Sequence, residues 1–97
     1  MNELIARHSL EQDALLEFVK TAAILDDLYH RIGELEETVE ALDKNIEDAD
    51  AKRYKDVTDL LCHTRNTINL QRLELQIQAS KLEIKLAEFE KVRMLTK

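Results

Sequence analysis

Residues 28–49 read LYHRIGELEETVEALDKNIEDA and place apolar side chains at alternating intervals of four and three residues. Helices with this heptad spacing keep one apolar edge turned toward a partner helix over many turns. The row consists of Leu28, Ile32, Leu35, Val39, Leu42, Ile46 and Ala49. The spacing predicts a long helix that packs lengthwise against another helix.

The composition of the chain agrees with a fold built from long helices. The 97 residues include no proline and one glycine, and 35% of them are charged while 4% are aromatic. Such a composition is typical of coiled coils and long helices. We therefore expect an all-α fold in a single domain that spans residues 1–97. A chain of this length buries a modest share of its surface, which favours self-association.

The charge balance and the single cysteine narrow the classes of partner. The net charge is −6, whereas binding to nucleic-acid phosphates or anionic lipids requires a basic surface. We therefore expect no direct contact with nucleic acid or with a membrane.

Cys62 has no second cysteine for an internal disulfide, and we recognise neither a signal sequence nor a membrane-spanning apolar run. These features predict a cytoplasmic protein.

The helix boundaries follow from capping signals and from polarity. Ser9 and Gln12 have the spacing of a capping box, which predicts a first helix over about residues 10–47. The least apolar part of the chain predicts a turn at about residues 48–52. A second helix is then expected over about residues 52–94.

Two features leave alternatives open. Gly33 either is tolerated inside the first helix or ends it and creates a three-helix chain. The heptad spacing continues in phase across Gly33, which favours one helix.

At the turn, Asp48 or Asp50 is expected to cap the second helix. No glycine or proline forces the turn, so a single rod about 130 Å long is the rival to a hairpin.

The two halves of the chain carry opposite charge, which favours a long antiparallel helical hairpin resembling a coiled coil. Residues 1–50 hold 14 acidic and 4 basic side chains, whereas residues 51–97 hold 6 acidic and 10 basic ones. Exposed ion pairs contribute little stability each, but together they select orientation. In the expected pairing, Glu34, Glu36 and Glu37 lie near Arg65, and Asp26 and Asp27 lie near Arg72.

The second helix has two apolar faces. The face expected to meet the first helix holds Tyr54, Val57, Leu61, Ile68, Leu75, Ala79, Leu82, Leu86 and Phe89. The opposite face holds Leu70, Leu73, Ile77, Ile84 and Leu95. A simple hairpin leaves that second face exposed, which is unusual for a monomer. It predicts a homodimer that forms a four-helix bundle, with a groove for a client helix as the alternative.

The alternating residues of segments 73–77 and 82–86 also permit a strand interpretation. It is disfavoured because residues 78–81 contain no typical hairpin-turn residue.

Nine of the twelve residues between Ala14 and Leu25 are apolar. A helix that is apolar nearly all round is buried on more than one side, so this segment is expected to be the most enclosed part of the fold. Together with the second face, it gives the predicted partner or dimer interface: Leu15, Phe18, Val19, Leu70, Leu73, Ile77 and Ile84.

The residues that carry chemistry do not converge on a site. One glycine rules out a glycine-rich phosphate loop, and no catalytic signature is present. Cys62 and His63 are adjacent, so on a helix they point about 100° apart and are poorly placed to share a metal. We expect no catalytic residue, no metal site and no cofactor, and hence no enzyme.

Two functions remain as hypotheses. The first is a non-enzymatic protein–protein interaction module: a small cytoplasmic adaptor, scaffold or chaperone that acts as a homodimer and binds another protein. The alternative is an acidic inhibitor, or nucleic-acid mimic, that blocks a basic groove of its partner. For that alternative, the docking strip consists of Glu34, Glu36, Glu37 and Glu40.

Overall fold

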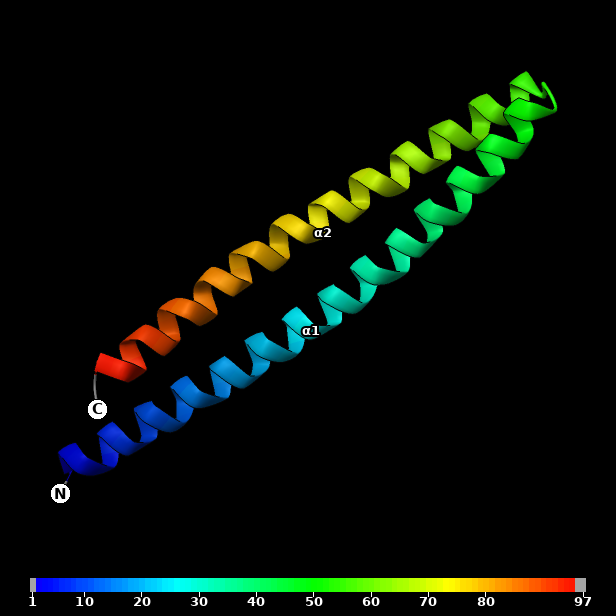
Figure 1. Ribbon diagram of the computed structural model, residues 1–97. Coiled ribbons are helices and arrows are strands. Elements are labelled where there is room, and N and C mark those ends of the chain that lie inside the picture. Colours follow the sequence, from blue (N-terminus) through cyan, green and yellow to red (C-terminus); the bar gives the residue numbers. More distant parts are fainter. Residues whose placement is uncertain (1, 96–97) are drawn as a thin grey trace.

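The chain forms a helical hairpin in a computed structural model, which describes the backbone of residues 2–95 and the side chains of residues 11–92. Helix α1 spans Asn2–Ala51 and helix α2 spans Lys55–Leu95. The two helices run antiparallel, and the start of α1 extends beyond the last turn of α2 at the end of the hairpin remote from the turn (Figure 1). The predicted all-α hairpin is confirmed, and the described residues contain no strand.

The hairpin is long and thin. Its extents are 77 × 18 × 14 Å and its radius of gyration is 21.8 Å, whereas a compact domain of this length has a radius of gyration of about 12.5 Å. The long dimension matches a helix of 50 residues, about 75 Å at the usual rise. Each helix therefore has one neighbour and leaves most of its circumference exposed.

The buried contact between the helices follows the heptad row of α1. Leu25, Leu28 and Ile32 form the core cluster with Ala79 of α2, and half-buried Leu75, Leu82 and Leu86 pack against it. The row extends further toward the N-terminus than residue 28, through Ala14, Phe18, Thr21 and Leu25 at the same spacing. Near the open end the Phe18 and Phe89 rings pack with their centroids 5.1 Å apart.

α1 begins at Asn2, and not near residue 10 as expected. Residues 2–10 contain neither glycine nor proline, so nothing in the backbone interrupts the helix before Ser9. The capping-box spacing at Ser9 and Gln12 therefore falls inside a helix that is already under way.

α1 passes through Gly33 without a break, so the three-helix alternative is wrong. A Cβ atom added at Gly33 would meet nothing within 4 Å. The substitution Gly33→Ala is therefore expected to raise the free energy of unfolding by about 1 kcal/mol, because glycine is the poorer helix former. Urea unfolding followed by circular dichroism measures the change. The reverse exchange at an exposed mid-helix position, Ala41→Gly, should lower the free energy of unfolding by a similar amount. Equal stabilities of the wild type, Gly33→Ala and Ala41→Gly would contradict a helix-propensity cost at Gly33.

The turn occupies residues 52–54, later than expected, and is held by backbone hydrogen bonds. The Tyr54 N–H donates to the Ala49 carbonyl at 3.0 Å, and the Arg53 N–H donates to the Asp50 carbonyl at 3.0 Å. This pair of bonds is a Schellman motif. Asp48 and Asp50 therefore belong to the last turn of α1 and do not cap α2. Burial of Ala49 against α2 favours this extension, because it keeps the last turn of α1 packed.

Arg53 carries the unfavourable backbone conformation of this turn, with φ at 62°. In the left-handed region a residue with a Cβ atom has a conformational free energy about 1–2 kcal/mol less favourable, whereas glycine adopts this conformation without that cost. The variant Arg53→Gly is expected to raise the midpoint of urea unfolding, by an amount equivalent to about 1 kcal/mol. Arg53→Ala keeps the Cβ atom and should give no such gain. A gain shared by both variants would assign the effect to the lost charge instead.

The position of the turn also sets which charges meet across the hairpin. Arg65 Nη1 lies 3.2 Å from Asp43 Oδ1, and Arg72 Nη1 lies 3.7 Å from Glu36 Oε1. The partners expected from the sequence were wrong by six to ten residues along α1, in part because the turn lies further along the chain than predicted. The expected orientation, with acidic α1 beside basic α2, is confirmed by these two pairs.

Candidate protein-binding surface

The side of α2 that faces away from α1 carries a second apolar row. Its large members are between 41% and 62% exposed, and with Ser80 and Ala87 they repeat at intervals of three and four residues. We call this set the back row: Leu70, Leu73, Ile77, Ser80, Ile84 and Ala87. The face predicted from the sequence is thus present and uncovered, except that Leu95 lies outside the described side chains.

The helical geometry explains why both rows occur on one helix. The inner row of α2 includes Leu61, Ile68, Leu75 and Leu82 at strict intervals of seven. Ile77 and Ile84 each follow an inner residue by two positions, which places them about 200° further round the helix. α1 therefore covers the inner row and leaves the back row in solvent.

The N-terminal third of α1 carries another exposed apolar set, which we call the α1 patch: Leu15, Leu16 and Val19. Each of these side chains is about half exposed. The expectation that residues 14–25 are the most enclosed part of the fold is wrong for the single chain. Helix α2 covers a single stripe of this segment of α1, and that stripe contains Ala14, Phe18 and Thr21.

Phe18 differs from the other residues predicted for a partner interface. It is half-buried and packs on Phe89 inside the hairpin. Tyr54 and Val57, which were expected on the inner face of the second helix, are exposed. Tyr54 lies in the turn, and Thr58 takes the inner position that was assigned to Val57.

Two of the four glutamates in the predicted acidic docking strip lie close to basic side chains of the same chain. Glu36 faces Arg72 across the hairpin, and the Glu34 carboxylate lies 3.0 Å from His30 Nε2 on the same helix. Glu37 and Glu40 are exposed. Two of the four carboxylates are therefore already engaged within the chain.

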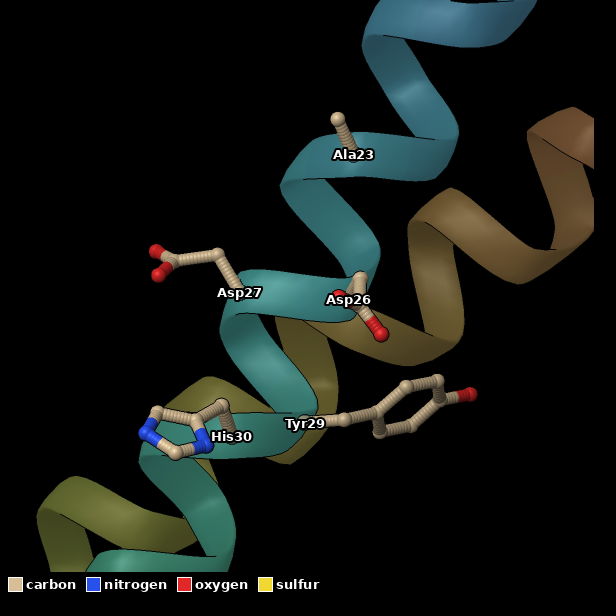
Figure 2. A pocket seen from close by; sticks show the side chains of 5 residues that line it. All are labelled: Ala23, Asp26, Asp27, Tyr29 and His30. Carbon is tan, nitrogen blue, oxygen red and sulfur yellow. The ribbon is translucent and has the colours of Figure 1, made fainter.

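A shallow hollow on α1 does not bring reactive groups together. It is lined by Ala23, Asp26, Asp27, Tyr29 and His30, which all lie on the one helix. In Figure 2, Asp27 and His30 extend to one side of α1 while Tyr29 extends to the other. The hollow is therefore an open space between successive helical turns.

The remaining chemistry-bearing residues are similarly dispersed. Within the part of the chain that the structure describes, no group of three or more His, Cys, Asp or Glu residues is arranged to hold a metal ion. Cys62 is a free, half-buried thiol on the flank of α2. Over residues 2–95, neither helix contains an apolar segment of the length and hydropathy needed to cross a bilayer.

The total exposed area shows how much surface the hairpin leaves uncovered. The accessible surface is 8049 Å², while a compact monomer of 11.3 kDa exposes about 5,700 Å². The difference exceeds the total area of about 1,600 Å² that a standard protein interface buries.

No protein-family model, curated protein or solved structure matches this chain.

Proposed function

We propose that this chain is a non-enzymatic protein–protein interaction module, a small cytoplasmic helical adaptor, scaffold or chaperone that acts as a homodimer. The observation that carries the proposal is the back row, which repeats with heptad spacing and has no partner within the hairpin. Heptad spacing matches a second helix and not an irregular ligand.

The same surface is a poor candidate for catalysis and a good one for association. Its members are aliphatic or small, and an exposed aliphatic row of this kind marks an interaction site. The α1 patch supplies a second apolar area, formed by Leu15, Leu16 and Val19. In our proposal the back row joins two copies and the α1 patch is available to another protein.

The test of assembly is the molar mass in solution, measured by light scattering after gel filtration at micromolar concentration. The expected mass is twice the 11.3 kDa of the chain, and Ile77→Asp should reduce it to that of the monomer. Gln78→Asp introduces the same carboxylate outside the back row and should leave the dimer intact. A wild-type protein that stays monomeric would overturn the proposal.

The acidic inhibitor is the second candidate, supported by the exposure of Glu37 and Glu40. The engagement of Glu36 and Glu34 within the chain makes the strip shorter than the sequence suggested. The two candidates differ in salt dependence, because exposed charge–charge contacts are screened over about 8 Å at physiological ionic strength. Capture of a host partner that survives high salt and fails with Leu16→Asp supports the adaptor. Capture that is lost in salt and with Glu37→Lys and Glu40→Lys supports the inhibitor.

A further inference from the structure

We infer that two copies of the chain associate through their back rows with the two α2 helices antiparallel, in one defined register. This inference rests on the proposed homodimer and adds its geometry. It is carried by the shape of the back row and by the charges that flank it.

The register follows from the sizes of the side chains. In an antiparallel pair of helices with heptad spacing, each layer combines the two kinds of heptad position. One alignment places Leu73 against Ile84 of the second copy, Leu70 against Ala87, and Ile77 against Ser80. Every large side chain then meets an apolar or small one. Sliding the helices by one heptad instead places Ile84 against Asn66 and Ala87 against His63.

The charges beside the back row favour the same alignment. Glu74 and Lys81 are exposed and lie on one flank of the row, one heptad apart. In the favoured antiparallel register Glu74 faces Lys81 of the second copy, and symmetry repeats the pair. The slipped register places Glu74 against Glu74. A parallel pair places Glu83 beside Glu88, so both competing arrangements bring like charges together.

The two apolar rows of α2 lie on nearly opposite sides of the helix, which determines the arrangement of the four helices. The α1 helices occupy the outside and the two α2 helices the middle, in a layer instead of a closed square bundle. The α1 patch is left uncovered by this contact. The exposed area in excess of a compact monomer is sufficient for an interface of ordinary size.

Disulfide trapping tests the orientation on a Cys62→Ser background, which removes the native thiol. Leu73→Cys and Ile84→Cys are prepared separately, mixed, allowed to exchange and oxidised. The antiparallel register predicts a covalent dimer in the mixture and none in either variant alone, because two copies of position 73 then lie about 16 Å apart along the axis. A disulfide requires Cα atoms within about 7 Å. Cross-linking of each variant with itself would overturn the antiparallel arrangement while leaving the homodimer intact.

Charge exchange at the flank provides an independent readout in the full chain. Glu74→Lys alone is expected to raise the dissociation constant of the dimer about threefold to tenfold, since two attractive pairs become repulsive. Combining it with Lys81→Glu should restore the wild-type value. Circular dichroism confirms that each variant retains its helices. Equal dissociation constants for the single and wild-type proteins would contradict the register, and a monomeric wild type would contradict the proposed function itself.

Discussion

The variant Leu28→Ala is expected to lower the free energy of unfolding by about 3 kcal/mol. Leu28 is 7% exposed and belongs to the core cluster with Leu25, Ile32 and Ala79. Truncating a buried leucine removes its transfer free energy and leaves a cavity, which together amount to about 2–5 kcal/mol. A two-helix hairpin has few other buried side chains to compensate. Urea unfolding at a fixed protein concentration gives the value, since stability depends on concentration when a dimer forms.

Ile24→Ala is the matched control for this prediction. It removes the same number of carbon atoms from the same helix, one turn before Leu28, but Ile24 is 55% exposed. Its effect should lie within about 0.5 kcal/mol of zero. If the two variants were equally destabilised, the burial of the inner row could not be the source of the stability.

The architecture was predictable because periodicity is a long-range signal that many residues share. Seven apolar residues from Leu28 to Ala49 fix one face of α1, and no single substitution alters that assignment. The back row was found in the same way, from Leu70, Leu73, Ile77 and Ile84. Thr21 was not recognised as part of the inner row because its side chain is polar. It is nevertheless buried, with its hydroxyl donating to the Glu17 carbonyl at 2.8 Å.

The turn was harder to predict because it depends on the conformation of one residue. A left-handed position after a helix usually holds glycine, and here it holds Arg53. The sequence signal was therefore missing, and the acidic residues before it suggested an earlier turn. The displaced turn moved the partners of Arg65 and Arg72 by six to ten residues along α1, so the expected ion pairs were wrong. The burial around Leu15 and Val19 is also not predictable from composition, because apolar composition does not reveal how many helices surround a segment.

The variant Arg72→Leu is expected to stabilise the hairpin by about 1–2 kcal/mol. Arg72 occupies an inner position of α2, and its side chain is 26% exposed. Its guanidinium reaches the edge of the contact, where it pairs with Glu36 and donates from Nε to Asn69 Oδ1 at 3.0 Å. Leucine would bury a full apolar side chain in the row. Glu36 is half exposed, so it loses a partner without becoming a buried unpaired charge.

The thermal midpoint is a convenient measure, since each kcal/mol corresponds to about 4–8 °C for a domain of this size. Arg31→Leu serves as the control, because Arg31 is exposed and pairs with Asp27 along the same helix; it should leave the midpoint nearly unchanged. A lower midpoint for Arg72→Leu would show that the ion pair stabilises the fold. Replacing both Arg65 and Arg72 by leucine should raise the thermal midpoint further. It should also weaken the selection of one register between α1 and α2, because the inner row of α2 then loses the charges that distinguish this alignment from its neighbours.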